Sequence, residues 1–135
     1  MSPLRVTEFA VTSAIHSLIA VVDDDPALLR AISFSLEAEG FRVERHHTAR
    51  ALEEADLASA VCLVIDQRLP DGYGLDLISR LRRSGVHTPA VLITSDPPPM
   101  VQAWARALRI QIVEKPRMGA ELICAVRSAI DAPGS

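Results

Sequence analysis

The stretch IAVVDDDPALLR, residues 19–30, decides the fold, because a run of aliphatic residues ends abruptly at three aspartates. The aliphatic run is typical of a buried β-strand, and the residues after the aspartates are spaced as in an amphipathic helix. Carboxylates in contact repel: a pair about 4 Å apart interacts unfavourably by about 4 kcal/mol at an effective dielectric constant of about 20. A bound cation would offset this repulsion, so the stretch predicts a cation site between a strand and a helix.

Four further runs resemble the first in being rich in Val and Ile with little polar alternation, as in strands buried on both faces of a parallel sheet. The five expected strands are SLIAVV (17–22), FRVER (41–45), AVCLVID (60–66), AVLITS (90–95) and IQIV (110–113). Amphipathic helices are expected between and after them, at 26–40, 48–56, 73–85, 97–108 and 118–130. Five alternations of strand and helix predict an α/β fold, a doubly wound five-stranded parallel sheet with helices on both faces.

The first expected helix has clear end signals. Asp25 is the expected N-cap, and Gly40 stands where a helix commonly ends in the left-handed conformation. Leu28, Ile32 and Leu36 form the stripe that we expect to face the sheet.

Length and charge restrict the class of protein. The 135 residues suit one domain, expected at 17–131, with a mobile arm at 1–16 and a tail at 132–135. The net charge of −3 argues against a nucleic-acid surface, and the apolar runs are too short for a membrane span. Cys62 and Cys124 lie in apolar stretches, so we expect two reduced core thiols in a cytoplasmic protein.

Polar side chains follow four of the five expected strands, where carboxyl ends of parallel strands share one edge. They are Asp23, Asp24, Asp66, Thr94 and Lys115. Converging carboxylates suit Mg²⁺, and a lysine with a hydroxyl would hold the oxygens of a phosphoryl group. The sequence has no Gly-rich nucleotide loop after the first strand, so this group is expected as an acyl-phosphate on a carboxylate.

The polar residues lie in four segments, VVDDDP (21–26), CLVIDQRLPDGYGLDLI (62–78), VLITS (91–95) and VEKP (113–116). These segments resemble the signature segments of the receiver domain of two-component response regulators. The resemblance implies a flavodoxin-like fold, as in CheY, with strand order 2-1-3-4-5. The LPDGYG and EKP segments are similar to the FixJ and LuxR-type subgroup, whose members often carry a DNA-binding domain.

The resemblance also implies the chemistry of the site. Asp66 would accept a phosphoryl group from a phosphohistidine of a sensor histidine kinase or a phosphotransfer protein. Thr94 would contact the phosphoryl group and move with it, and Lys115 would pair with one of its oxygens. The peptide bond before Pro116 is commonly cis in the family.

The same resemblance implies how the metal is held. Asp24, Asp66 and the backbone carbonyl of Arg68 would bind Mg²⁺ directly, and Asp23 would act mostly through a metal-bound water. The domain would be a signalling switch rather than an enzyme, catalysing only its own phosphorylation and dephosphorylation.

Family members use the fourth helix, fifth strand and fifth helix for output, to a downstream protein or to a second copy. Two departures fall on this surface. Ile112 stands where the family usually has an aromatic residue, and Leu108 and Arg109 replace a Gly-Ala pair. The phosphorylation pocket is unaffected, so the departures concern the output mechanism.

Two other functions remain open at this stage. A pseudo-receiver would be an interaction module with an inactive pocket, against which the complete set of five polar residues argues. A haloacid-dehalogenase-type hydrolase would need a second carboxylate two residues after Asp66, where this sequence has Arg68.

Overall fold

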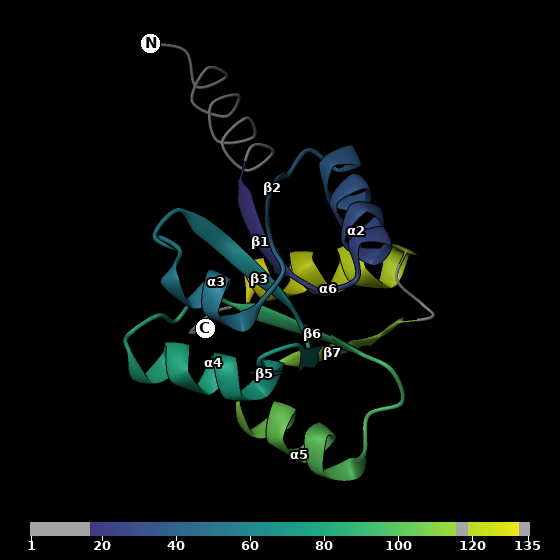
Figure 1. Cartoon of the computed structure of the whole chain (residues 1–135). Coiled ribbons are helices and arrows are strands. Elements are labelled where there is room, and N and C mark those ends of the chain that lie inside the picture. The colour runs from purple at the N-terminus through teal and green to yellow at the C-terminus, as the bar shows by residue number, and fades with distance from the viewer. Residues whose placement is uncertain (1–16, 116–118, 133–135) are drawn as a thin grey trace.

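A central parallel sheet organises the computed structural model, which describes residues 17–115 and 119–132 (Figure 1). Its strands are β1 (Leu18–Val22), β2 (Arg42–His46), β3 (Ala60–Asp66), β6 (Ala90–Thr94) and β7 (Gln111–Glu114). They lie in the order β2-β1-β3-β6-β7 and every neighbouring pair is parallel. Since β6 and β7 are the fourth and fifth expected strands, the predicted flavodoxin-like order is confirmed.

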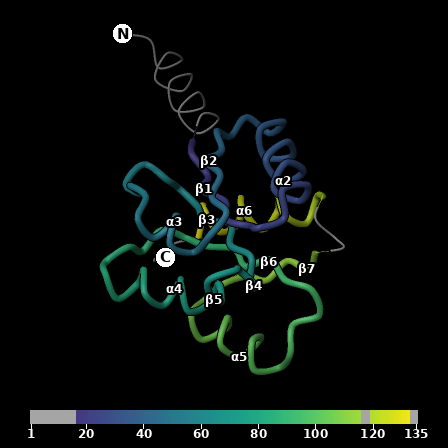
Figure 2. Tube along the Cα trace, in the orientation of Figure 1, coloured from purple at the N-terminus to yellow at the C-terminus, as the bar shows by residue number. Residues whose placement is uncertain are grey.

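Helices cover both faces of this sheet (Figure 2). One face is covered by α2 (Pro26–Ala38) and α6 (Gly119–Asp131). The other is covered by α3 (Ala49–Glu54), α4 (Gly74–Arg83) and α5 (Pro99–Ala107). Successive strand side chains point to opposite faces, so β1, β3, β6 and β7 contribute to both of these hydrophobic clusters, whereas β2 contributes Val43 to the cluster under α2 and α6.

The ends of α2 match the sequence prediction, but its buried stripe differs by one residue. The Asp25 carboxylate accepts a hydrogen bond from the amide of Ala27 at 3.0 Å, and Gly40 adopts a φ of 95°. Leu29 is buried with Ile32 and Leu36, whereas Leu28 is only half-buried. Leu28 still packs against the same hydrophobic cluster, so the predicted stripe is correct in its direction but omits Leu29. Two steps of four residues drift across the helix surface, which leaves Leu28 at the margin of the buried stripe.

The edge strand β2 and the second cysteine also correct the sequence analysis. β2 pairs only with β1, and its Arg42 and Arg45 are exposed, so it is not buried on both faces. Cys62 is fully buried, and burial raises the pKa of its thiol to about 12. Cys124 is exposed on α6, because it lies on the face of that helix opposite Leu122 and Val126.

A short hairpin that the sequence analysis did not predict connects β3 to α4. Its strands β4 (Arg68–Leu69) and β5 (Gly72–Tyr73) are antiparallel and enclose Pro70 and Asp71. Pro, Asp and Gly in this order favour a tight turn, and Gly72 adopts a φ of 147°. The LPDG sequence was therefore the available signal for this hairpin.

Some predictions fall outside the described residues. These are the arm at 1–16, the peptide bond to Pro116 and the last three residues of the tail.

Arg109, which together with Leu108 replaces the Gly-Ala pair of the family pattern, adopts a φ of 59°. Within the described ranges, every helix is too short or too polar to cross a lipid bilayer.

Gly74 permits α4 to pack directly against the end of β3, which generates a first prediction. A Cβ atom at Gly74 would lie 2.5 Å from the carbonyl oxygen of Asp66 and 2.9 Å from Cδ1 of Leu92. Because the first of these atoms belongs to the backbone of a central strand, it cannot move aside. We expect Gly74→Ala to lower the free energy of unfolding by about 3 kcal/mol in urea denaturation.

Gly119→Ala is the matched control, because nothing lies within 4 Å of a Cβ atom at Gly119. It should be neutral, or stabilising by up to about 1 kcal/mol through helix propensity. Equal urea midpoints for the two variants would contradict this account of Gly74.

Candidate functional site

The carboxyl ends of the strands bring the predicted acidic residues together. One carboxylate oxygen from each of Asp23, Asp24 and Asp66 lies within 4.8 Å of the others. Asp23 and Asp66 are buried, whereas Asp24 is exposed at the mouth of the cluster. Thr94 ends β6 beside β3 and is 5% exposed. These three aspartates are called the acidic cluster below.

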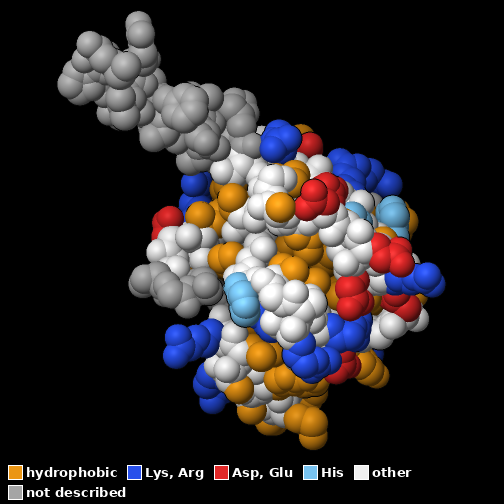
Figure 3. Space-filling model, turned by 90° about the vertical axis from the view of Figure 1, so that its left-hand side faces the viewer, with side chains coloured by type: hydrophobic (Ala, Val, Ile, Leu, Met, Phe, Trp, Pro, Cys, Tyr) orange, Lys and Arg blue, Asp and Glu red, His pale blue; other side chains and the backbone are white. Residues whose placement is uncertain are grey.

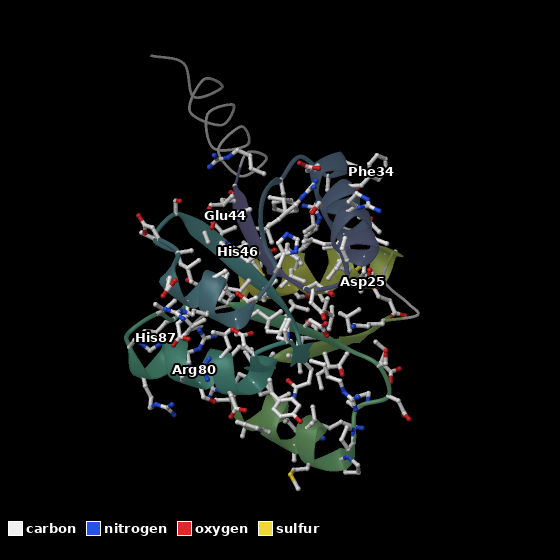
Figure 4. The ribbon with its side chains drawn as sticks, in the orientation of Figure 1. Asp25, Phe34, Glu44, His46, Arg80 and His87 are labelled. Carbon is white, nitrogen blue, oxygen red and sulfur yellow. The ribbon has the colours of Figure 1, made fainter. Side chains whose placement is uncertain are left out.

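The acidic cluster contains two of the three consecutive aspartates of the sequence. The third, Asp25, lies at the start of α2 (Figure 4) and caps that helix through the amides of Ala27 and Leu28. The run of three charges therefore divides into two roles, and only two of its carboxylates repel each other within the cluster.

Asp66 is held by contacts from both sides. The Nζ atom of Lys115 lies 3.1 Å from each of its carboxylate oxygens. The backbone amide of Arg68 donates to Oδ1 at 3.3 Å. Burial raises the pKa of Asp66 above its ordinary value, and the hydrogen bond and charge of Lys115 oppose this effect.

Asp23 is the least compensated group of the acidic cluster. Its side chain is 0% exposed, and its Oδ1 accepts a hydrogen bond from the amide of Asp25 at 2.9 Å. Its Oδ2 is buried with no hydrogen-bond partner among the described residues. Burial raises the pKa of Asp23 to about 6, and the nearby charge of Asp66 adds to the effect.

The donor atoms of the acidic cluster fit a hard divalent cation. Carboxylate oxygens are the ligands that Mg²⁺ prefers, and it commonly binds through one or two of them while keeping several waters. The unpartnered Oδ2 of Asp23 is a buried acceptor that an ion or its water would satisfy. The cluster thus has the chemistry that the sequence analysis expected at this edge of the sheet.

Gln67 shapes the backbone beside Asp66, and the sequence analysis missed it. Its amide donates to the carbonyl of Ile93 at 2.9 Å, and its own carbonyl accepts from the amide of Gly74 at 2.9 Å. Its side-chain Oε1 accepts from the amide of Leu75 at 3.0 Å. Gln67 therefore closes the base of the hairpin on the first turn of α4, a role that no local pattern in the sequence indicates.

A hollow of about 410 Å³ opens on another part of the surface, between α5, β7 and the start of α6. Ala105, Ile110 and Ile112 line it together with charged side chains that include Glu114 and Glu121. Ile112 is half-buried beside the hydrophobic cluster. This is the surface on which the sequence departs from the receiver pattern.

Comparisons with known proteins identify related chains. The response regulator receiver domain family model matches residues 19–127. The transcriptional regulatory protein FixJ of Azorhizobium caulinodans is 33% identical over 115 residues, covering 83% of this chain and 54% of that protein. The response regulator protein TmoT of Ectopseudomonas mendocina is 34% identical over 118 residues, covering 85% of this chain and 53% of that protein. The chain thus spans about half the length of these relatives.

Solved structures show the same fold at lower identity. The non-phosphorylated HemR receiver domain of Leptospira biflexa superimposes with a TM-score of 0.78 at 24% identity, covering 88% of this chain and 98% of that one. A CheY-like receiver domain protein of Methanospirillum hungatei gives a TM-score of 0.76 at 23% identity, covering 86% and 94%. At these identities the likeness concerns the fold alone.

The burial of Asp23 generates a prediction about pH. Its pKa of about 6 in the folded protein lies above the ordinary aspartate value of 3.8, so the folded state binds this proton more tightly than the unfolded chain. Without divalent cations, raising the pH from 4 to 7 should lower the free energy of unfolding, by about 2 kcal/mol from this group. Asp23→Asn removes the ionisation and should unfold at a higher urea concentration than wild type at pH 7.

The advantage of Asp23→Asn should disappear near pH 4, where both side chains are neutral. Asp56→Asn is the control, because Asp56 makes the same local contact while exposed, accepting from the amide of Ala58 at 3.0 Å. Urea titrations from pH 4 to 8 in the presence of a chelator measure the difference. An advantage independent of pH would exclude ionisation of Asp23 as its cause.

Proposed function

Since this chain belongs to the family of response regulator receiver domains, we propose that it is a signalling switch in which Asp66 accepts a phosphoryl group. One observation carries the proposal: a buried carboxylate at the end of the central strand lies between a lysine and two further carboxylates. That arrangement supplies a nucleophile, a cation for the phosphoryl oxygens and ligands for a metal ion in one place.

In the proposed reaction, a carboxylate oxygen of Asp66 attacks the phosphorus of a phosphohistidine. The phosphorus–nitrogen bond breaks, an acyl-phosphate forms, and the histidine leaves with a proton from solvent. Lys115 already contacts both oxygens of Asp66 at 3.1 Å, so it needs only a small shift to pair with a phosphoryl oxygen. Thr94 would donate its hydroxyl to the same group from the end of β6.

Mg²⁺ is the proposed cofactor, bound by Asp24, Asp66 and the backbone carbonyl of Arg68, with Asp23 acting through a metal-bound water. Such an ion spreads the negative charge of the phosphoryl group during transfer. The unpartnered oxygen of Asp23 and the position of Asp24 at the mouth of the cluster support this division of roles.

The proposed phosphodonor is a sensor histidine kinase or a phosphotransfer protein, in the cytoplasm. The proposed output surface comprises α5, β7 and α6, and would contact a downstream protein or a second copy of the chain. Direct contact with nucleic acid is not proposed, because the net charge is −3 and the face in Figure 3 carries acidic and basic side chains interspersed.

Small-molecule phosphorylation tests the proposal. Acetyl phosphate with Mg²⁺ should add one phosphoryl group to the wild-type chain and none to Asp66→Asn, as measured by intact mass. Asp25→Asn is the matched control from the same run of aspartates, because Asp25 caps α2 and should leave labelling unchanged. Chelating the metal should abolish labelling.

Each of the other possible results would change either the acceptor residue or the proposed function. Equal labelling of wild type and Asp66→Asn would move the acceptor to another residue. A complete lack of labelling with Mg²⁺ present would favour a pseudo-receiver, and sustained turnover of a phosphoester without an adduct would favour a hydrolase.

Ile112 generates a prediction about the switch itself. A β-branched side chain is stiff at its first torsion, and isoleucine has neither a long aromatic ring nor a hydroxyl group. Ile112 therefore cannot swing inward on activation as the usual aromatic residue does. We expect the phosphoryl mimic beryllofluoride to produce large amide chemical-shift changes at residues 94–100 and smaller ones at Ile112. Ile112→Tyr should enlarge the response of β7, because the adjoining hollow of about 410 Å³ offers space for a ring.

Two-dimensional NMR of both proteins, with and without beryllofluoride, measures these responses. Shifts at Ile112 as large as those at residues 94–100 in the wild-type chain would show that β7 switches without an aromatic lever.

A further inference from the structure

The tip of the β4–β5 hairpin contacts a helix distant from it in the sequence. Asp71 accepts a hydrogen bond at Oδ1 from the amide of Ala49, at 2.9 Å, and at Oδ2 from the amide of Arg50, at 3.0 Å. These are the first two amides of α3, more than twenty residues earlier in the chain. Both oxygens of one carboxylate are used, so the contact fixes the orientation of Asp71 as well as its position.

This contact completes the capping of α3 rather than duplicating it. Thr48, the residue before the helix, accepts from the amide of Ala51 at 3.0 Å, and its carbonyl accepts from Leu52 at 3.3 Å. The amides of Ala49 and Arg50 have no acceptor within the helix. Asp71 supplies both acceptors, and these hydrogen bonds lower the pKa of its carboxyl group.

The helix at the other end of the contact is itself held in place. Ala49 and Leu52 of α3 are buried in the hydrophobic cluster. Glu53 accepts a hydrogen bond from Nε of Arg80 on α4, which lies 3.2 Å from Oε1 and 3.1 Å from Oε2 of Glu53 (Arg80 is labelled in Figure 4). Because α4 follows the hairpin directly, α3, α4 and the hairpin form a closed set of contacts.

The hairpin carries the backbone that adjoins the acidic cluster. Arg68 donates its amide to Asp66 at 3.3 Å and stands three residues before Asp71. The hairpin has only two residue pairs, Arg68 with Tyr73 and Leu69 with Gly72, and a ladder this short has little stability of its own. Its base is fixed by the contact between Gly74 and Gln67, and its tip by Asp71.

From this geometry we propose that Asp71 is a positioning residue of the site, tethering the hairpin to α3 so that the backbone of Arg68 stays in place beside Asp66. The inference rests on the proposed function, because it assigns Asp71 a role in metal binding and phosphorylation at Asp66. The competing role is that of a helix cap alone, which would affect stability but not the metal.

Asp71→Ala should weaken Mg²⁺ binding by about tenfold, in the range seen when groups that orient metal ligands are removed. It should slow labelling by acetyl phosphate at Mg²⁺ concentrations below saturation and restore it at high Mg²⁺. Asp71→Asn keeps one of the two acceptor oxygens and should be intermediate. NMR titration of the wild-type and variant chains with Mg²⁺ gives the dissociation constants, and urea denaturation gives the stabilities.

Thr48→Ala is the matched control, because it removes a cap from the same helix without touching the hairpin. It should lower stability while leaving the Mg²⁺ dissociation constant within about twofold of wild type. Equal effects of Asp71→Ala and Thr48→Ala on Mg²⁺ binding, or none from either, would reduce Asp71 to a helix cap and overturn this inference alone. Failure of the wild-type chain itself to bind Mg²⁺ would overturn the proposed function together with it.

Discussion

The ion pair between Lys115 and Asp66 is the contact on which the organisation of the site depends. It joins the central strand β3 to the edge strand β7, which are separated in the sheet by β6. Asp66 is 1% exposed, and a carboxylate that has lost most of its hydration requires an opposite charge or hydrogen-bond donors nearby. A group that drew Lys115 or Asp66 to a new partner would therefore change a contact that spans three strands.

The positive charge of Lys115 balances only one of the three negative charges of the acidic cluster. The excess negative charge affects both the stability of the domain and its ability to bind a cation. The unpartnered oxygen of Asp23 and the raised pKa of its carboxyl group both show a site that disfavours its own negative charge. A divalent cation would relieve that cost, since a ligand bound only by the folded state stabilises it. The feature that makes the cation-free domain less stable is thus the one that favours metal binding.

The close packing of α4 against the end of β3 limits which side chains the sequence can have at the site. Gly74 lets the first turn of α4 approach the backbone of Asp66 more closely than any side chain would allow. Gln67 uses its backbone and side chain to fasten the same turn. The loop that carries the Arg68 backbone is therefore built between a close backbone contact at its base and the Asp71 carboxylate at its tip, and its position depends on both.

The strands and the cap of α2 could be predicted from the sequence, because hydrophobic periodicity and capping depend on contiguous residues. The order of the strands was implied by the resemblance to receiver domains. The meeting of Asp66 and Lys115 followed as well, since parallel strands present their carboxyl ends at one edge. The exposure of Cys124 could also have been predicted, because helix periodicity places it opposite Leu122 and Val126. The burial of Leu29 rather than Leu28 and the reach of Asp71 to α3 were decided only by the tertiary structure, because they depend on how α2 and the hairpin pack against distant parts of the chain.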